Sequence, residues 1–279
     1  MLAQPEFSPL AMRLPPDGFL SPLMDPWRQQ TRQSAHAWFS LVEDLNRSAI
    51  AILPKLNPQT SSDREIGAAA MFGRALQSFE AVILLTERGM LADAGSIARN
   101  IVESAIYLGG LSMLDDFPRR MAASNNRHYF TMAESLAHQI ETKGCDGETQ
   151  DAIELRQLLE DVKTQGHMRK SINLRDLAIE TEMDGLYDVV YRQLSGDAAH
   201  VSLASVERHV ARGASGRIER LIFGPQRDGL ESILSAATSA LLGAMEVLHD
   251  VFPIHDIRQA IDEHNARHHS IGALRARRG

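Results

Sequence analysis

IGAAAMFGRALQSFEAVILLTERG at residues 66–89 and LADAGSIARNIVESAIYLGGLSM at residues 91–113 are the two stretches that decide the fold of this chain. Both are apolar almost all round at helical spacing, which is typical of helices buried at the centre of a bundle. A tight Arg-Gly turn joins them, and a short connection between two helices makes them antiparallel neighbours. We therefore predict a central antiparallel helical hairpin.

Helical patterns continue on both sides of this hairpin, each ending at a proline, a glycine or a polar turn. The further helices are predicted at residues 27–53, 115–142, 148–164, 174–183, 186–199 and 230–251. Residues 212–229 carry four glycines and a β-leaning run, so a short hairpin or ordered loop is expected there. Aromatic residues make up only 5% of the chain and no alternating strand series occurs, so the predicted fold class is an all-α multi-helix bundle.

The distribution of prolines and charges predicts three parts of the chain. Six of the eleven prolines lie within the first 26 residues, which predicts an extended or disordered Pro-rich arm at 1–25 that could clasp a partner. Residues 26–255 are predicted to form a single helical bundle domain. Residues 256–279 end in arginines and are predicted to be a short helix with a basic tail.

Composition narrows the functional class. The net charge of -7 disfavours general affinity for nucleic acids. The single cysteine, Cys145, excludes an internal disulfide and a cysteine-based zinc cluster, which fits a reducing cytoplasm. No stretch approaches the roughly 18 consecutive apolar residues of a membrane span, so we expect a soluble cytoplasmic protein without a membrane partner. No Gly-rich phosphate loop or nucleophile elbow is present, and no cofactor is expected.

Two polar constellations interrupt the apolar helices. Arg99 and Glu103 are four residues apart and so share one helix face, while Tyr187, Tyr191 and Ser195 form a second stripe that leads to His200. Polar groups in a helical core cost free energy unless they are paired. Either the two stripes bind each other or they line a site, and the sequence leaves both readings open.

The same region carries a series of small motifs. RALQSFE occurs at residues 74–80, LLTERG at 84–89, Arg-x3-Glu at 99–103 and Tyr-x3-Ser-x4-His at 191–200. In order and spacing these motifs resemble the domain-of-unknown-function family 5677, over roughly residues 70–205. The resemblance implies a bacterial helical protein of uncharacterised function. The general fold of such proteins is similar to that of helical bundles in bacterial toxin and defence systems, and many of those bundles cut RNA. This similarity implies a stress or defence context.

In those ribonucleases an arginine is followed four to six residues later by a histidine. The arginine steadies the scissile phosphate and the histidine moves a proton, so this chain can be searched for the same spacing. Only Arg258 and His264 fit, whereas about three matches are expected by chance, so the match carries no information. Arg192 and His200 are too far apart for the pattern. Two functions remain: a non-catalytic binding or interaction module, and alternatively a ribonuclease or nucleotide-binding enzyme that uses His200 with Arg99 and Arg192. The catalytic candidates are His200, Ser195, Tyr191, Arg99 and Glu103.

A locally basic segment suggests a ligand surface. RNA or a phosphate-bearing ligand would be held by guanidinium groups, although a solvated loop explains the same composition. The candidate binding residues are Arg192, Arg208, Arg212, Arg217 and Arg220. We also expect self-association into a homo-oligomer or an unknown protein partner.

No metal site is expected. A di-iron bundle needs two Glu-x-x-His units, and only Glu246 with His249 has that spacing. The histidines of the C-terminal segment, His264, His268 and His269, are interpreted as part of a polar tail.

Overall fold

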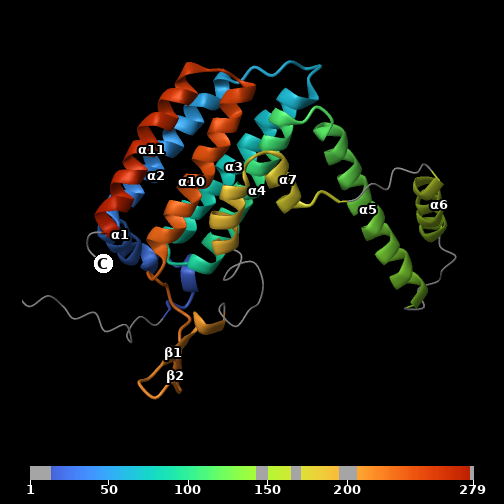
Figure 1. Cartoon of the computed structure of the whole chain (residues 1–279). Helices are drawn as coiled ribbons and strands as arrows, with labels where there is room; N and C mark the ends of the chain where they lie inside the picture. The colour runs from blue at the N-terminus through green and yellow to red at the C-terminus, as the bar shows by residue number, and fades with distance from the viewer. Residues whose placement is uncertain (1–13, 143–149, 165–170, 195–205, 277–279) are drawn as a thin grey trace, which may run out of the picture.

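The computed structural model describes residues 14–142, 150–164, 171–194 and 206–276. In the described chain, helices form a packed bundle and the only sheet is a two-stranded hairpin (Figure 1), which confirms the predicted all-α class.

Three helices form the centre of the bundle. α3 (Asp63–Glu87) packs along α4 (Leu91–Met113), and α10 (Leu230–Val251) packs against both. The Ser62 hydroxyl caps α3 by accepting from the Glu65 amide at 3.2 Å, and Gly89 with φ of +77° makes the turn into α4. The predicted central hairpin is therefore confirmed, and the bounds predicted for 91–113 and 230–251 match.

The outer helices differ from the single helix predicted at 27–53. The chain breaks at Ala35, with φ of −114° and ψ of 33°, into α1 (Asp25–Ser34) and α2 (His36–Ile52). The break turns α1 so that Arg28 and Arg32 reach Glu87 at the end of α3. The helix thus changes direction at Ala35, although alanine is a strong helix former, and the change accompanies these ion pairs between α1 and α3.

The N-terminal part described by the structure is folded rather than extended. Two 3-10 turns, η1 (Gly18–Leu20) and η2 (Pro22–Met24), lead into α1, and Met24 is buried. The prediction of an extended arm is wrong for residues 14–25, because Met24 is buried and η2 begins with Ser21 accepting from the Leu23 amide. Residues 1–13 of the predicted arm lie outside the described residues.

The C-terminal segment is longer and more buried than expected. α11 (His255–Ala276) packs against α2 and α10, and Ile257, Ile261 and His264 are each no more than 1% exposed. The interpretation of this segment as a polar tail is wrong for His264, whose Nε2 lies 2.9 Å from the Ser48 hydroxyl.

Beyond the centre, α5 (Phe117–Thr142) leaves the bundle and α6 (Gln150–Thr164) lies near its far end (Figure 1). α7 (Leu174–Glu180) begins where the Asn173 side chain accepts from the amides of residues 175 and 176, and it packs on α4. η4 (Leu186–Tyr191) is a π-helix between short α-helical turns. β1 (Val210–Arg212) and β2 (Ile218–Leu221) pair antiparallel, which confirms the β-leaning segment.

Two adjacent glycines let other elements approach α4 closely. A Cβ atom at Gly109 would lie 2.8 Å from Met183 Sδ, and one at Gly110 would lie 2.6 Å from the Phe117 ring. The glycines therefore allow the turn before η4, and the start of α5, to sit directly on α4. This close packing is what brings η4 over the polar face of α4.

Two described helices, α3 and α10, are long and apolar enough to cross a membrane by length and composition alone. Buried helices at the centre of a soluble bundle meet the same criteria, and 39% and 61% of the respective apolar windows are buried inside this bundle.

Candidate functional site

The polar stripe of α4 meets the polar stripe of η4. Arg99 and Glu103 lie one turn apart on α4, and Tyr191 comes from the last residue of η4. An Arg99 Nη2 group donates to the Tyr191 hydroxyl, which in turn donates to Glu103 Oε1 at 3.1 Å. These three residues, which we call the α4–η4 cluster, form a closed triangle of charged and polar groups.

The guanidinium of Arg99 serves two partners in this triangle. Its Cζ lies 4.4 Å from the centre of the Tyr191 ring, within the range of a cation–π contact. Its Nε lies 3.3 Å from Glu103 Oε1, which is an ion-pair distance although the geometry is not that of a hydrogen bond. Arg99 is thus held on one side by a ring face and on the other by a carboxylate.

The π-helix arranges the two tyrosines. The rings of Tyr187 and Tyr191 stack with centres 4.8 Å apart and planes 19° apart. π-helices are rare and occur mostly as single turns within α-helices, frequently at functional sites. In η4 the π-helix accompanies the ring stack and the hydrogen bonds of Tyr191 to α4.

Burial and charge set the protonation of the cluster. The pKa of Tyr191 is raised, first because burial disfavours the phenolate and then because Glu103 is negatively charged, while Arg99 opposes both effects. The pKa of Tyr107 is raised by burial and then by the same carboxylate. Tyr191 therefore stays protonated at neutral pH and acts as a hydrogen-bond relay rather than as a base.

The other candidate residues are placed apart from this triangle or fall outside the description. Ser195 and His200 lie outside the described residues. Arg192 is exposed, pairs with Asp188 at 2.9 Å, and lies 6.0 Å from the centre of the Tyr187 ring. Its guanidinium is already engaged on η4.

The remaining arginines belong to the β1–β2 hairpin and the residues before it. Arg212 pairs with Glu207 at 2.9 Å, and Arg217 is exposed near the turn. Arg208 is half-buried, and burial lowers its pKa. Arg220 lies on β2. The structure thus divides the predicted site residues between the α4–η4 cluster and a separate basic hairpin.

Sequence reasoning missed a second charged cluster. Glu87 is only 3% exposed, yet it accepts from Arg28 at 2.6 Å and from Arg32 at 2.9 Å. Both arginines lie on α1, four residues apart. The sequence held two signals for this cluster: the helical spacing of the two arginines, and a carboxylate at the end of an apolar helix. Neither signal indicates that residues so far apart in sequence pair with each other.

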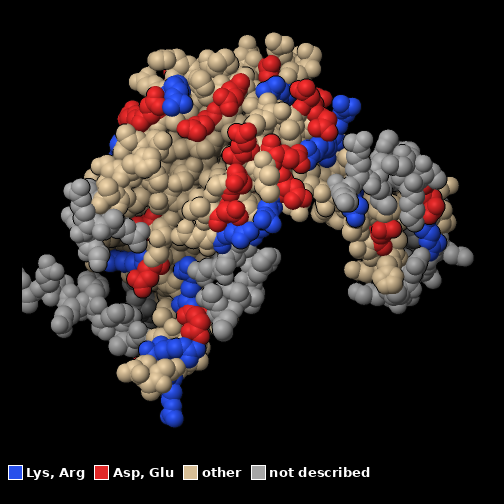
Figure 2. All heavy atoms as spheres, in the orientation of Figure 1, with Lys and Arg blue, Asp and Glu red and all other residues tan. Residues whose placement is uncertain are grey.

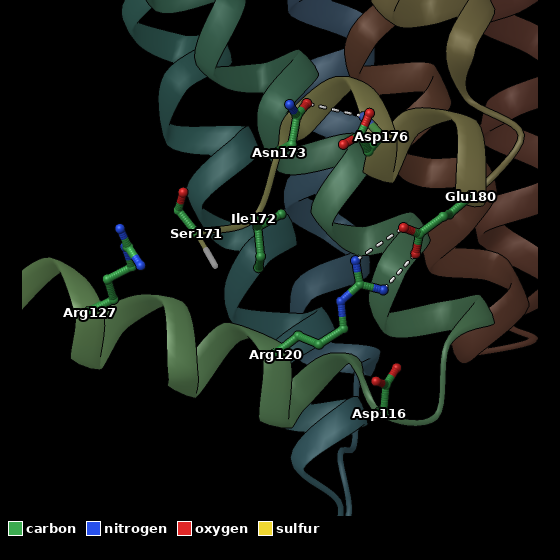
Figure 3. A pocket seen from close by; sticks show the side chains of 8 residues that line it. All are labelled: Asp116, Arg120, Arg127, Ser171, Ile172, Asn173, Asp176 and Glu180. Carbon is green, nitrogen blue, oxygen red and sulfur yellow. Dashed lines mark hydrogen bonds and ion pairs between the residues drawn. The ribbon is translucent and has the colours of Figure 1, made fainter. Parts of the chain in front are cut away.

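Sequence reasoning also missed a charged hollow of about 730 Å³ between α5 and α7 (Figure 3). Arg120 reaches across it to Glu180 with contacts of 2.6 and 3.3 Å, which lowers the pKa of Glu180. Figure 3 shows Arg127 at the other end, away from that pair. The lining side chains are Asp116, Arg120, Arg127, Ser171, Ile172, Asn173, Asp176 and Glu180.

No group of three or more His, Cys, Asp or Glu side chains suited to a metal ion occurs among the residues that the structure describes.

The fold is an all-α bundle in which charged groups pair across helices. They do so in the α4–η4 cluster and in the cluster of Glu87 with Arg28 and Arg32. The chain belongs to the family described as "Family of unknown function (DUF5677)", whose family model matches residues 65–217. That span includes nearly all of α3, all of α4 and η4, and the strand β1, and it therefore contains the whole α4–η4 cluster; β2 begins one residue after the span ends. No curated protein and no solved structure was found to match the chain.

Proposed function

We propose that this protein is a non-catalytic interaction module, acting in a bacterial stress or defence setting. The observation that carries the proposal is the α4–η4 cluster, in which Arg99 and Glu103 are paired with each other and both hydrogen-bond to Tyr191. A catalytic constellation would instead bring its groups together at an open cleft that leaves room for a reacting atom. Groups that satisfy one another stabilise the contact between two helices.

The enzymatic alternative draws its cations from residues that are already engaged. It requires Arg99 and Arg192 to hold a phosphate beside His200. Arg99 is bound to Tyr191 and Glu103, and Arg192 is paired with Asp188. Each guanidinium would have to exchange a carboxylate partner for the phosphate; the exchange costs little for the exposed Arg192–Asp188 pair and more for the partly buried Arg99.

Exposed apolar side chains on projecting elements support an interaction role. The hairpin segment exposes Ile218, Leu221 and Phe223, each more than half, and α5 exposes Tyr129 and Met132 to a similar degree. Apolar groups gathered on projecting elements are typical of surfaces that meet another protein. The compartment we propose is the cytoplasm, because a chain with a single cysteine has no internal disulfide to maintain.

The experiment that tests this function is an RNA cleavage assay on a mixed RNA pool. Wild type, His200→Ala and Tyr191→Phe are compared after circular dichroism has shown each to be folded. We expect no cleavage by any of the three, and a lower unfolding midpoint for Tyr191→Phe alone. Cleavage by wild type that is lost in a folded His200→Ala variant would replace the module with the ribonuclease.

A further inference from the structure

The β1–β2 hairpin is a projecting element with an unusual surface. In Figure 1 it extends from the lower end of the bundle, well away from α7. Ile218, Leu221 and Phe223 are 57%, 58% and 64% exposed. A two-stranded hairpin is marginally stable by itself, so one that exposes this much apolar surface gains from contact with a partner.

The base of the hairpin is fixed, so its surface is presented in a defined direction. The Gln226 amide donates to the Gly89 carbonyl at 3.0 Å, and its side chain donates to the Arg208 carbonyl at 2.9 Å. Arg227, next along the chain, lies 4.2 Å from the Trp27 ring centre and donates to Gln30. These contacts attach the hairpin to α1 and to the α3–α4 turn. A rigidly held surface loses less entropy when it binds.

The hairpin segment is basic. Residues 206–223 contain four arginines and two glutamates. Arg212 is neutralised by Glu207, whereas Arg217 is exposed and forms no ion pair with the described residues. The hairpin thus offers the cation of Arg217 directly before β2, a strand that exposes Ile218 and Leu221.

A second surface of the same chain has the opposite charge. Residues 174–191 hold five acids and one arginine, and all five acids are exposed. Figure 2 shows acidic side chains gathered across the middle of one face, over α7 and its neighbours. Apolar side chains, Ile179 at 56% and Val189 at 66% exposed, lie on the same segment. We call this surface the acidic ridge: Asp176, Glu182 and Asp184, together with Glu180 and Asp188, which already pair with Arg120 and Arg192.

We propose that the β1–β2 hairpin of one copy docks on the acidic ridge of a second copy. This inference deepens the proposed function and rests on it, because it names the partner of the interaction module. Each surface combines exposed apolar groups with charge, and the two charges are opposite, which favours both encounter and register. Because one chain carries both surfaces, two copies can form the contact twice and close as a symmetric dimer.

RNA is the competing occupant of a basic hairpin, and the charges of the chain disfavour it. The net charge is -7, and the hairpin segment has an excess of only two arginines over glutamates. Affinity for nucleic acid grows with the number of phosphates that are neutralised, so a surface with so few free cations binds RNA weakly. A complementary acidic protein surface needs fewer charges because apolar contacts supply part of the free energy.

A charge swap on the full-length chain tests the contact. Arg217→Glu, Asp184→Arg and the double variant are compared with wild type by sedimentation velocity at low and high salt. Arg74→Glu is the matched control, since Arg74 is an exposed arginine on α3, outside both surfaces. We expect wild type and the control to sediment as at least two chains. Each single reversal should weaken association about tenfold, and the double variant should restore most of it.

Three results would overturn the proposal. They are a monomer at every concentration and salt, an assembly that neither single reversal weakens, and a loss of assembly that the double variant does not restore. Binding of labelled single-stranded RNA that Arg217→Glu abolishes and the double variant does not rescue would assign the hairpin to RNA instead. A monomeric chain that does not cut RNA defeats only this inference, whereas an assembling chain that cuts RNA defeats only the proposed function.

Discussion

Replacing Gly89 with alanine tests how the α3–α4 turn supports the rest of the molecule. Gly89 has φ of +77°, and a Cβ atom there would lie 2.6 Å from Pro225 Cβ and 2.7 Å from the Gln226 backbone nitrogen. A left-handed backbone costs a residue with a side chain about 1–2 kcal/mol. Overpacking against backbone that cannot move aside adds about 1–3 kcal/mol. We therefore expect Gly89→Ala to destabilise the protein by about 2–5 kcal/mol.

The assay is urea unfolding followed by circular dichroism, with Gly73→Ala as the matched control. Gly73 lies inside α3, and a Cβ atom there would meet nothing within 4 Å. Alanine favours the helix over glycine, so the control should gain up to about 1 kcal/mol. A cost below about 1 kcal/mol for Gly89→Ala would refute the reasoning, because strain and clash together could not then be present.

Three further changes probe other parts of the structure. Glu87→Gln should lower the free energy of unfolding by about 1–3 kcal/mol, because the change leaves Arg28 and Arg32 without their shared carboxylate. An unchanged midpoint of urea unfolding would contradict a stabilising role for that cluster. Glu182→Gly should raise the free energy of unfolding by about 0.5–1 kcal/mol, because Glu182 holds φ of 55° after α7, and a loss in the same assay would count against it. Burial lowers the pKa of His264 and of His268 below the ordinary value of 6.5, so the folded chain binds fewer protons than the unfolded chain and stability is lost as pH falls through 6.5. Melting temperatures between neutral and mildly acidic pH should show this loss, with a smaller drop for His264→Gln, and equal drops in both proteins would contradict it.

The sequence predicted well the elements that are defined by their own residues. The helices at 91–113 and 230–251 are apolar along their length and are bounded by Gly89 and Pro253, so spacing and stop signals set their limits. The hairpin at β1–β2 was likewise indicated by a β-leaning run between glycines. These features require no knowledge of distant contacts.

Features set by distant contacts were not predictable in the same way. The break at Ala35 occurs at a strong helix former and accompanies the pairing of α1 with Glu87, more than 50 residues away. The cluster of histidines predicts a polar tail, whereas α11 packs the His264 side chain against Ser48 of α2.

The candidate site was predicted in part. The spacing of Arg99 and Glu103 indicated a shared helix face, and the structure adds that Tyr191 closes the triangle from a π-helix. A π-helix is a rare local insertion in a helical segment, so helical periodicity alone does not predict it. Ser195 and His200 lie beyond the described residues, and their role stays a prediction.

The measurement that tests the central claim most directly is a double-mutant cycle between Arg99→Ala and Tyr191→Phe, read by urea unfolding. Glu103 is 38% exposed, so Arg99→Ala alone should cost about 1–2 kcal/mol rather than the full cost of stranding a buried charge. If the α4–η4 cluster joins the two helices, the two effects should be coupled by about 1 kcal/mol or more. Losses that add to within about 0.3 kcal/mol would contradict a structural cluster and return Arg99 and Tyr191 to the list of catalytic candidates.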